Sequence, residues 1–317
     1  MSLHRTIMQT NFDSVLDPAS GANGAKLTIA LKVTLVPLDP RAGGSPPTRM
    51  QPGPALLEQN NVDDASLVRG NVLDASASPV PVKCKSWRIA EWNAFKARFK
   101  SMVELTWNNQ MVFLPIEDGD PRDALTDEDY RQFIGNRRIR AHAEGAIRIA
   151  LMPVGSVSHA VIEVARRDNP AASFRDEMSR ISDQSVFFRQ HRDSRWPKSF
   201  FGQPSAAHEV GHWLTDLISP FFSHEDADYA AALTPGPGET QAQFSKRQDK
   251  DQYGHTLGRR VALMGAGSLV TEYDAGPWLT RIRRHTRKLG WSYIHRVNFS
   301  NIEYDLTLRQ KRLTGRP

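Results

Sequence analysis

The sequence SAAHEVGHWLTDL at residues 205–217 has the apolar spacing of an amphipathic helix and places two histidines four residues apart. Its apolar residues recur at the three- and four-residue intervals of one helix face: Val210, Trp213, Leu214 and Leu217. Ser205 is a suitable N-cap, and Pro204 ends any strand that comes before it. We therefore predict a helix that is capped by Ser205 and has a buried apolar face.

Three residues of this helix form the pattern H-E-x-x-H: His208, Glu209 and His212. Positions four apart project from one helix face, so both imidazoles can bind one metal ion. Zinc held in this way keeps a position open for water and lowers the pKa of that water, and the glutamate accepts the proton. We predict Zn2+ as the cofactor, His208 and His212 as ligands and Glu209 as general base. Gly211 is a poor helix former, and we expect it to permit close packing near the metal.

A catalytic zinc site needs a third protein ligand, which this stretch does not supply. The metzincin motif would place glycine at 215 and histidine or aspartate at 218, where this chain has Thr215 and Ile218. The strict metzincin class is therefore excluded. The remaining candidates are histidines and carboxylates farther along the chain: His224, Asp226, Asp228, His255, Glu272 and Asp274.

The segments HEVGHWL at 208–214 and LMGAGSLVTEYDAGPWL at 263–279 together resemble a known family. They are similar to the zinc metallopeptidase toxin domains at the C-termini of type VI secretion spike proteins of the VgrG type, and to related zincins of contractile injection systems. The resemblance covers about residues 200–290 and rests on the zinc helix, on the turn Met264-Gly265-x-Gly267 and on Pro277-Trp278-Leu279. In that family a carboxylate beyond the methionine turn completes the metal site. This implies Glu272 as the third ligand, with Asp228, Asp274 and His255 as alternatives.

The residues before Glu272 agree with this implication. Glycines at 265 and 267 permit a tight turn within the apolar run Val261–Val270, and Met264 is suited to pack beneath the metal. His255, with Tyr253 nearby, is a candidate to stabilise the oxyanion of a tetrahedral intermediate. Plain core packing for Met264 and a surface position for His255 are the alternative interpretations.

Apolar and polar residues alternate over Lys26–Leu35, which predicts a half-buried strand. A helix is expected from Ser86, capped by that serine, with a buried face made of Trp92, Phe95, Phe99, Met102 and Val103. The other expected elements are a strand at Met111–Ile116, a short helix at 127–134 capped by Thr126, and strands at Ala146–Val154 and His159–Ala165 that form a hairpin or two successive strands of a sheet. Prolines and glycines predict a loop at 37–54, and 55–81 is expected to have little regular structure.

Together these features predict an α+β, zincin-like fold in which a mixed β-sheet packs on the HExxH active-site helix and a smaller helical part follows at the C-terminus. We expect residues 1–80 to provide an N-terminal strand and an extended segment, and residues 81–317 to form the metallopeptidase domain, with its metal-binding core at about 200–290. An extended substrate can add to the edge of a strand, for which Ser185–Gln190 and Val161–Ala165 are candidates. The polar loop at 219–251 is either a lid or a simple excursion.

The composition is that of a water-soluble folded protein. Of 317 residues, 39% are hydrophobic and 24% charged, and no run reaches the roughly 18 apolar residues of a membrane span. The first residues, MSLHRTIMQTNFDSVLD, lack the apolar core of a Sec signal. The single cysteine, Cys84, excludes an internal disulfide, and we expect it to be a buried thiol. The net charge of +6 is spread out, and we expect the densest basic group, at 281–288, to be a solvated helix face.

The resemblance implies a zinc metalloendopeptidase that acts on a protein or peptide substrate as a bacterial toxin effector. Such an effector is made in the cytoplasm and exported to a target cell by a type VI secretion machine, with a spike protein and a cognate immunity protein as partners. One alternative is a zincin-fold structural or binding component of a contractile injection or phage-like system, without turnover. The other is a nucleic-acid-binding protein that uses the basic segment at 281–296 beside a structural metal.

Overall fold

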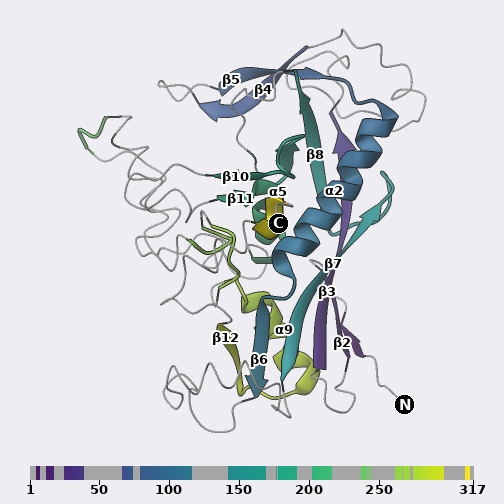
Figure 1. The fold of residues 1–317 in the computed structure, drawn as a ribbon, viewed down its shortest axis with the longest axis vertical. Helices are drawn as coiled ribbons and strands as arrows, with labels where there is room; N and C mark the ends of the chain where they lie inside the picture. The colour runs from purple at the N-terminus through teal and green to yellow at the C-terminus, as the bar shows by residue number, and fades with distance from the viewer. Residues whose placement is uncertain are drawn as a thin grey trace.

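The computed structural model is an α+β fold organised around one mixed β-sheet (Figure 1). The structure describes residues 5–7, 12–17, 25–38, 66–73, 79–115, 142–168, 176, 178–190, 202–215, 237–240, 243, 261–265, 267–271, 274–295 and 311–314. The strands of the sheet are β1 (Arg5–Ile7), β2 (Asp13–Asp17), β3 (Ala25–Pro37), β4 (Ser66–Leu73), β5 (Pro79–Lys85), β6 (Met111–Pro115), β7 (Ala143–Met152), β8 (Ala160–Arg167), β9 (Arg180–Ser182) and β12 (Trp291–His295). A separate pair consists of β10 (Phe188–Gln190) and β11 (Gly202–Pro204), and the helices that matter here are α2 (Ile89–Trp107), α5 (Ser205–Thr215) and α9 (Gly276–Thr286). The predicted α+β class with a mixed sheet is confirmed.

The main path of the sheet follows the order β12-β6-β7-β3-β8-β5-β4. β3 pairs in parallel with β7 over Ala25–Thr34 and with β8 over Val33–Pro37. The pairs β6–β7, β6–β12 and β5–β8 are antiparallel. Because β3 lies between β7 and β8, which come from later in the chain, the sheet contains strands from both sides of residue 80.

The predicted strand at Lys26–Leu35 is confirmed as the main part of β3. Its alternating apolar residues are all buried: Leu27, Ile29, Leu31, Val33 and Leu35. The expected half-burial holds only near the start, where Lys26 is exposed, because Thr34 and Val36 on the opposite face are also buried. Alternation indicates which face is apolar, and it does not show whether another element covers the second face.

β7 and β8 confirm the second of the two predicted arrangements, because they are successive strands of one sheet and not a hairpin. They lie on opposite edges of β3, and the chain crosses from one edge to the other through a turn with Gly155 at φ 86°. His159 fixes the crossing: its backbone N–H donates to the Lys32 carbonyl at 2.9 Å, and its Nδ1 accepts the Lys32 N–H at 3.0 Å.

Helix α2 confirms the predicted aromatic face. Trp92, Phe95, Phe99 and Val103 are buried, while Met102 is partly exposed. The predicted cap is wrong, because the N-cap residue is Arg88, two residues after Ser86, and its N–H donates to Glu91 at 3.3 Å. At the other end of α2, Trp107 stacks on Trp278 of α9 with ring centroids 5.4 Å apart. The helix thus ends inside the core, and the strand expected at Met111–Ile116 follows as β6.

The expectation of little regular structure at 55–81 is wrong where the structure describes that segment. β4 and β5 form an antiparallel pair with an irregularity between Arg69 and Val72. Pro79 and Pro81 lie within β5 although proline cannot donate to a strand ladder. The loop expected at 37–54 lies outside the described residues beyond Leu38, and so does the helix expected at 127–134 with its cap Thr126.

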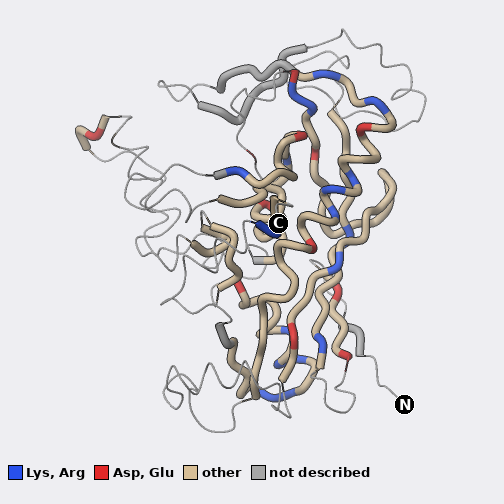
Figure 2. Tube along the Cα trace, viewed as in Figure 1, with Lys and Arg blue, Asp and Glu red and all other residues tan. Residues whose placement is uncertain are grey.

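In the described part of the C-terminal region, α9 is followed by a strand, β12, which pairs with β6 at the edge of the sheet. The basic group on α9 is also only partly solvated: Arg283, Arg284, Arg287 and Lys288 are exposed, while Arg281 and His285 are buried. Figure 2 shows basic and acidic residues interspersed along the described elements. No helix in the described part of the chain is long and apolar enough to cross a membrane.

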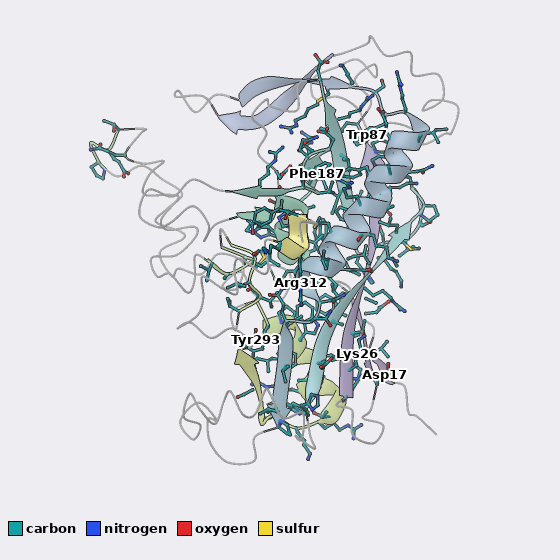
Figure 3. The ribbon with its side chains drawn as sticks, viewed as in Figure 1. Asp17, Lys26, Trp87, Phe187, Tyr293 and Arg312 are labelled. Atoms are coloured by element: carbon teal, nitrogen blue, oxygen red, sulfur yellow. The ribbon has the colours of Figure 1, made fainter. Side chains whose placement is uncertain are left out.

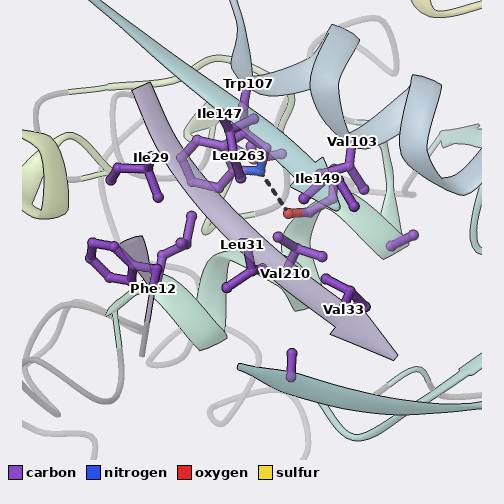
Figure 4. Close-up of a cluster of buried hydrophobic side chains, with 14 of the residues drawn as sticks. Phe12, Ile29, Leu31, Val33, Val103, Trp107, Ile147, Ile149, Val210 and Leu263 are labelled. Atoms are coloured by element: carbon purple, nitrogen blue, oxygen red, sulfur yellow. Dashed lines mark hydrogen bonds between the residues drawn. The ribbon is translucent and has the colours of Figure 1, made fainter. Parts of the chain in front are cut away.

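The core is one large cluster that joins the sheet to all three helices. Figure 4 shows Leu31 and Val33 of β3 among Trp107 of α2, Val210 of α5 and Leu263. The Trp107 indole N–H donates to the Ala207 carbonyl at 3.0 Å and so ties α2 to α5. The sheet and α2 therefore hold α5 in a fixed position within the core.

Candidate metal centre

Helix α5 is buried along almost its whole length. Ala206, Ala207, Val210 and Leu214 have no exposed surface, while Trp213 is partly exposed. Ser205 is the first residue of the helix and not its N-cap, and its hydroxyl donates to Oδ2 of Asp176 at 2.5 Å. The predicted helix is confirmed, with its start one residue earlier than predicted, and Leu217 lies beyond the described residues.

The two histidines of α5 converge. Their Nε2 atoms are 3.2 Å apart, and the ring planes cross at 80° with centroids 4.9 Å apart. His208 is 4% exposed and His212 8%. Two buried imidazole nitrogens that point at one another from positions four apart make a pair of donors for one cation.

The hydrogen bond of Nδ1 determines the tautomer of His208. Nδ1 lies 2.8 Å from the Leu263 carbonyl oxygen, which can only accept, so Nδ1 carries the hydrogen. In the neutral ring this leaves the lone pair on Nε2, the atom that faces His212. A histidine that ligates a metal is commonly oriented by such a bond from its second nitrogen.

Glu209 lies beside the two histidines and completes a group that could hold a metal ion. Its Oε2 is 3.9 Å from Nε2 of His212, and the ligand atoms of His208, Glu209 and His212 all lie within 4.8 Å of one another. Glu209 is 7% exposed. The three residues of the sequence motif are thus brought together as predicted.

A turn-rich segment, residues 261–271, packs under α5, and we call it the floor loop; all of it but residue 266 is described. A Cβ added at Gly211 would lie 2.1 Å from Sδ of Met264, so the glycine lets the methionine approach the helix. A Cβ at Gly267 would lie 2.0 Å from the Val261 carbonyl oxygen, which explains the glycine there. The expected close packing at Gly211 is confirmed, whereas a position of Met264 beneath a metal ion stays a prediction.

Besides His208, side chains from several other segments hydrogen-bond to the floor loop. Asp274 Oδ1 accepts the Met264 N–H at 3.1 Å, and its Oδ2 accepts the Thr271 N–H at 2.7 Å and the Thr271 hydroxyl at 3.1 Å. The Tyr293 hydroxyl donates to the Val270 carbonyl at 2.8 Å, and Gln110 Oε1 accepts the Val270 N–H at 3.1 Å. Tyr293 reaches the loop from β12, where Figure 3 labels it.

Asp274 is one of the alternative third ligands, but in the structure its carboxylate binds the backbone of the floor loop. It is fully buried, and all its hydrogen bonds named above go to the floor loop. Burial raises the pKa of this carboxyl to about 6, against the effect of those hydrogen bonds. It does not belong to the group of ligand atoms formed by His208, Glu209 and His212.

Several predicted site residues lie outside the described residues: Glu272, His255, Tyr253, His224, Asp226 and Asp228. The roles of Glu272 as third ligand and His255 as oxyanion donor therefore stay predictions. Of the two candidate edges for a peptide, β8 is unsuitable because β3 pairs with one edge, and β9 and β5 pair with the other. β10 pairs with β11 alone among the described strands.

Two residues important to this region carried no signal in the sequence. Asp176 accepts hydrogen bonds from Ser185 at 2.6 Å, from the Ser182 N–H at 2.9 Å and from Ser205 at the start of α5. Burial raises the pKa of this carboxyl above its ordinary value. Gln203, which is buried in β11, contacts the floor loop. Both act over long sequence distances, so no local spacing could have indicated them.

Cys84 is not a candidate nucleophile. It is fully buried, and burial raises the pKa of its thiol to about 12. A thiol with such a pKa stays protonated at neutral pH and is unreactive. The expected buried thiol is confirmed.

Comparisons of the chain with protein-family models, with curated proteins and with solved structures return no match.

Proposed function

We propose that this chain is a zinc-dependent metallopeptidase with a zincin-like fold. The observation that carries the proposal is the pair of Nε2 atoms of His208 and His212, 3.2 Å apart beside the buried carboxylate of Glu209. Two nitrogens at zinc–nitrogen distances of about 2.0–2.1 Å and a tetrahedral angle are about 3.3 Å apart. The residues present therefore fit a zinc ion.

The donor atoms also favour zinc over the hard cations. Magnesium and calcium prefer sets of oxygen ligands, whereas imidazole nitrogens suit zinc and its neighbours in the first transition row. His208 already has the hydrogen on Nδ1 that leaves Nε2 available. His208 and His212 are thus the proposed ligands, and Glu272 is the proposed third.

Zinc bound there would supply a Lewis acid and acidify a water molecule at neutral pH. Glu209 would take a proton from the attacking water and pass it to the leaving amine, and the position of its carboxylate beside the histidine nitrogens supports this role. The Leu263 carbonyl holds the His208 ring in one tautomer throughout. His255 is the proposed donor to the oxyanion.

The proposed substrate is an extended segment of a protein. β10 has one edge paired with β11, and β11 leads directly into α5. A peptide that adds to the second edge of β10 would extend the strand pair whose member β11 leads into the helix that bears the ligands. The sequence resemblance supports a role as a toxin effector of a type VI secretion system, with a spike protein and an immunity protein as partners.

The test is hydrolysis of a mixture of unstructured peptides by the zinc-loaded chain, compared with Glu209→Gln. Removal of a general base slows the chemical step by about 10²–10⁴-fold, and we expect Glu209→Gln to keep its zinc because two imidazoles remain. Cleavage that survives in Glu209→Gln would contradict the proposed mechanism. A wild-type chain that binds zinc and cleaves nothing would favour the structural or binding alternative.

A further inference from the structure

The buried amide of Gln203 lies where the floor loop meets His208. Gln203 is the middle residue of β11 and is 4% exposed. One end of its amide is 2.7 Å from the carbonyl oxygens of both Leu263 and Gly267. An amide oxygen would be repelled by two carbonyl oxygens at that distance, so the amide nitrogen faces them and donates to both.

The Leu263 carbonyl therefore accepts two hydrogen bonds, from Gln203 at 2.7 Å and from Nδ1 of His208 at 2.8 Å. The direction of the carbonyl sets the direction of the His208 N–H, and through it the direction in which Nε2 points. We propose that Gln203 is a positioning residue of the metal centre, which holds the Leu263 carbonyl and thereby orients the His208 imidazole for the metal. This inference rests on the proposed metal site.

A second buried glutamine provides a matched control. Gln110 is 8% exposed and contacts the same floor loop, but its Oε1 accepts the N–H of Val270 and its Nε2 donates to the Thr106 carbonyl. Loss of Gln110 thus removes two buried hydrogen bonds, one of them to the loop, and leaves the partner of His208 in place. If Gln203 only stabilised the loop, the two glutamines would have the same effect on the metal.

The experiment measures zinc affinity of the full chain, Gln203→Met and Gln110→Met by competition with a chromophoric chelator. Methionine keeps nearly the volume of glutamine and removes the amide. We expect Gln203→Met to bind zinc about tenfold more weakly, the lower end of the effect of removing an outer-shell partner. We expect Gln110→Met to bind zinc as tightly as the unmodified chain, although both variants lose thermal stability.

The absorption spectrum of bound cobalt is a second measurement, which does not depend on the stability of the chain. The visible absorption of Co2+ bound to the chain depends on the ligand geometry, so the band should change in Gln203→Met and stay unchanged in Gln110→Met. If Gln203→Met does not fold, Gln203→Asn replaces it. Its shorter amide cannot reach both carbonyl oxygens, and the same two results are expected.

The outcomes separate this inference from the function on which it rests. An unmodified chain that binds neither zinc nor cobalt would remove the metal centre, and the role of Gln203 with it. Zinc binding that is equal in the unmodified chain and Gln203→Met, with identical cobalt spectra, would overturn the role of Gln203 and leave the metal centre intact. Equal losses of affinity in both variants would also overturn it, because they would indicate general loop stability.

Discussion

The floor loop and the contact between α9 and β2 are both buried and polar, but they differ in how completely their polar side chains are hydrogen-bonded. In the floor loop, Asp274, Gln110, Gln203 and Tyr293 are all hydrogen-bonded to backbone groups. Beside β2, Arg281 is fully buried, and its three guanidinium nitrogens have no hydrogen-bond partner among the described residues. The guanidinium group lies over the face of Phe12, with its carbon 4.3 Å from the ring centroid.

This difference shows that a buried polar side chain in this chain is not always hydrogen-bonded. Burial lowers the pKa of Arg281 to about 10, Arg284 acts in the same direction, and Asp13 acts against both. The residue therefore stays charged at neutral pH, and an unpaired buried charge costs stability. The polar side chains named above are hydrogen-bonded instead in the loop that contacts His208, which the proposed metal site needs in one orientation.

The largest effect on stability is expected at Arg281, in the contact between α9 and β2. Arg281→Met keeps the packing on Phe12 and removes the buried charge, so it should raise the free energy of unfolding by about 1–4 kcal/mol. Urea denaturation measures this change. Arg284→Met, at an exposed position one turn away on the same helix, is the control and should change it by less than about 0.5 kcal/mol. A clear loss of stability in Arg281→Met would mean that the guanidinium has a partner that this account lacks.

The packing of the floor loop on α5 is tested next. Gly211→Ala adds a methyl group where Sδ of Met264 would be 2.1 Å away, and overpacking costs about 1–3 kcal/mol. Better helix propensity returns about 1 kcal/mol of this. We expect Gly211→Ala to lose zinc affinity as well. The double variant Gly211→Ala/Met264→Ala removes the clash and should regain that affinity. A Gly211→Ala chain that is more stable than the parent, with unchanged zinc affinity, would show that the methionine is not confined.

The smallest effect concerns pH. Burial raises the pKa of Asp176 above its ordinary value of 3.8, despite hydrogen bonds from Ser185, Ser205 and Ser182. The folded chain therefore keeps this proton where the unfolded chain has lost it. The contribution of Asp176 to stability is complete below about pH 3.8 and is lost as the pH rises through the raised pKa. Asp176→Asn should lack that decline. Thermal unfolding of the metal-free proteins across this pH range measures it, and parallel pH profiles would contradict the assignment.

Local patterns in the sequence predicted the parts of the structure that depend on local spacing. The alternation over Lys26–Leu35 and the aromatic spacing from Trp92 to Val103 indicate which faces are apolar, and those faces are buried. The convergence of His208 and His212 follows from helix geometry alone. These predictions needed no knowledge of which segments pack together.

The remaining features depend on contacts between distant segments. Pro79 and Pro81 argue against a regular strand in this segment, yet Cys84 and Lys85 at the end of β5 pair with β8. Gly155 and Ser156 suit a hairpin turn, and only the position of β3 between β7 and β8 shows that the chain crosses over. Asp274 was weighed as a metal ligand because of its residue type, and its burial against the floor loop gives it a structural role instead.

The central claim is that α5 binds one zinc ion through His208 and His212. Elemental analysis of the purified chain after zinc loading and removal of excess metal tests it directly, with His208→Ala and His212→Ala as variants and His159→Gln as a control outside the site. The account predicts one zinc per chain in the parent and in His159→Gln, and none in the two alanine variants. A parent chain without zinc, or alanine variants that keep it, would contradict the account.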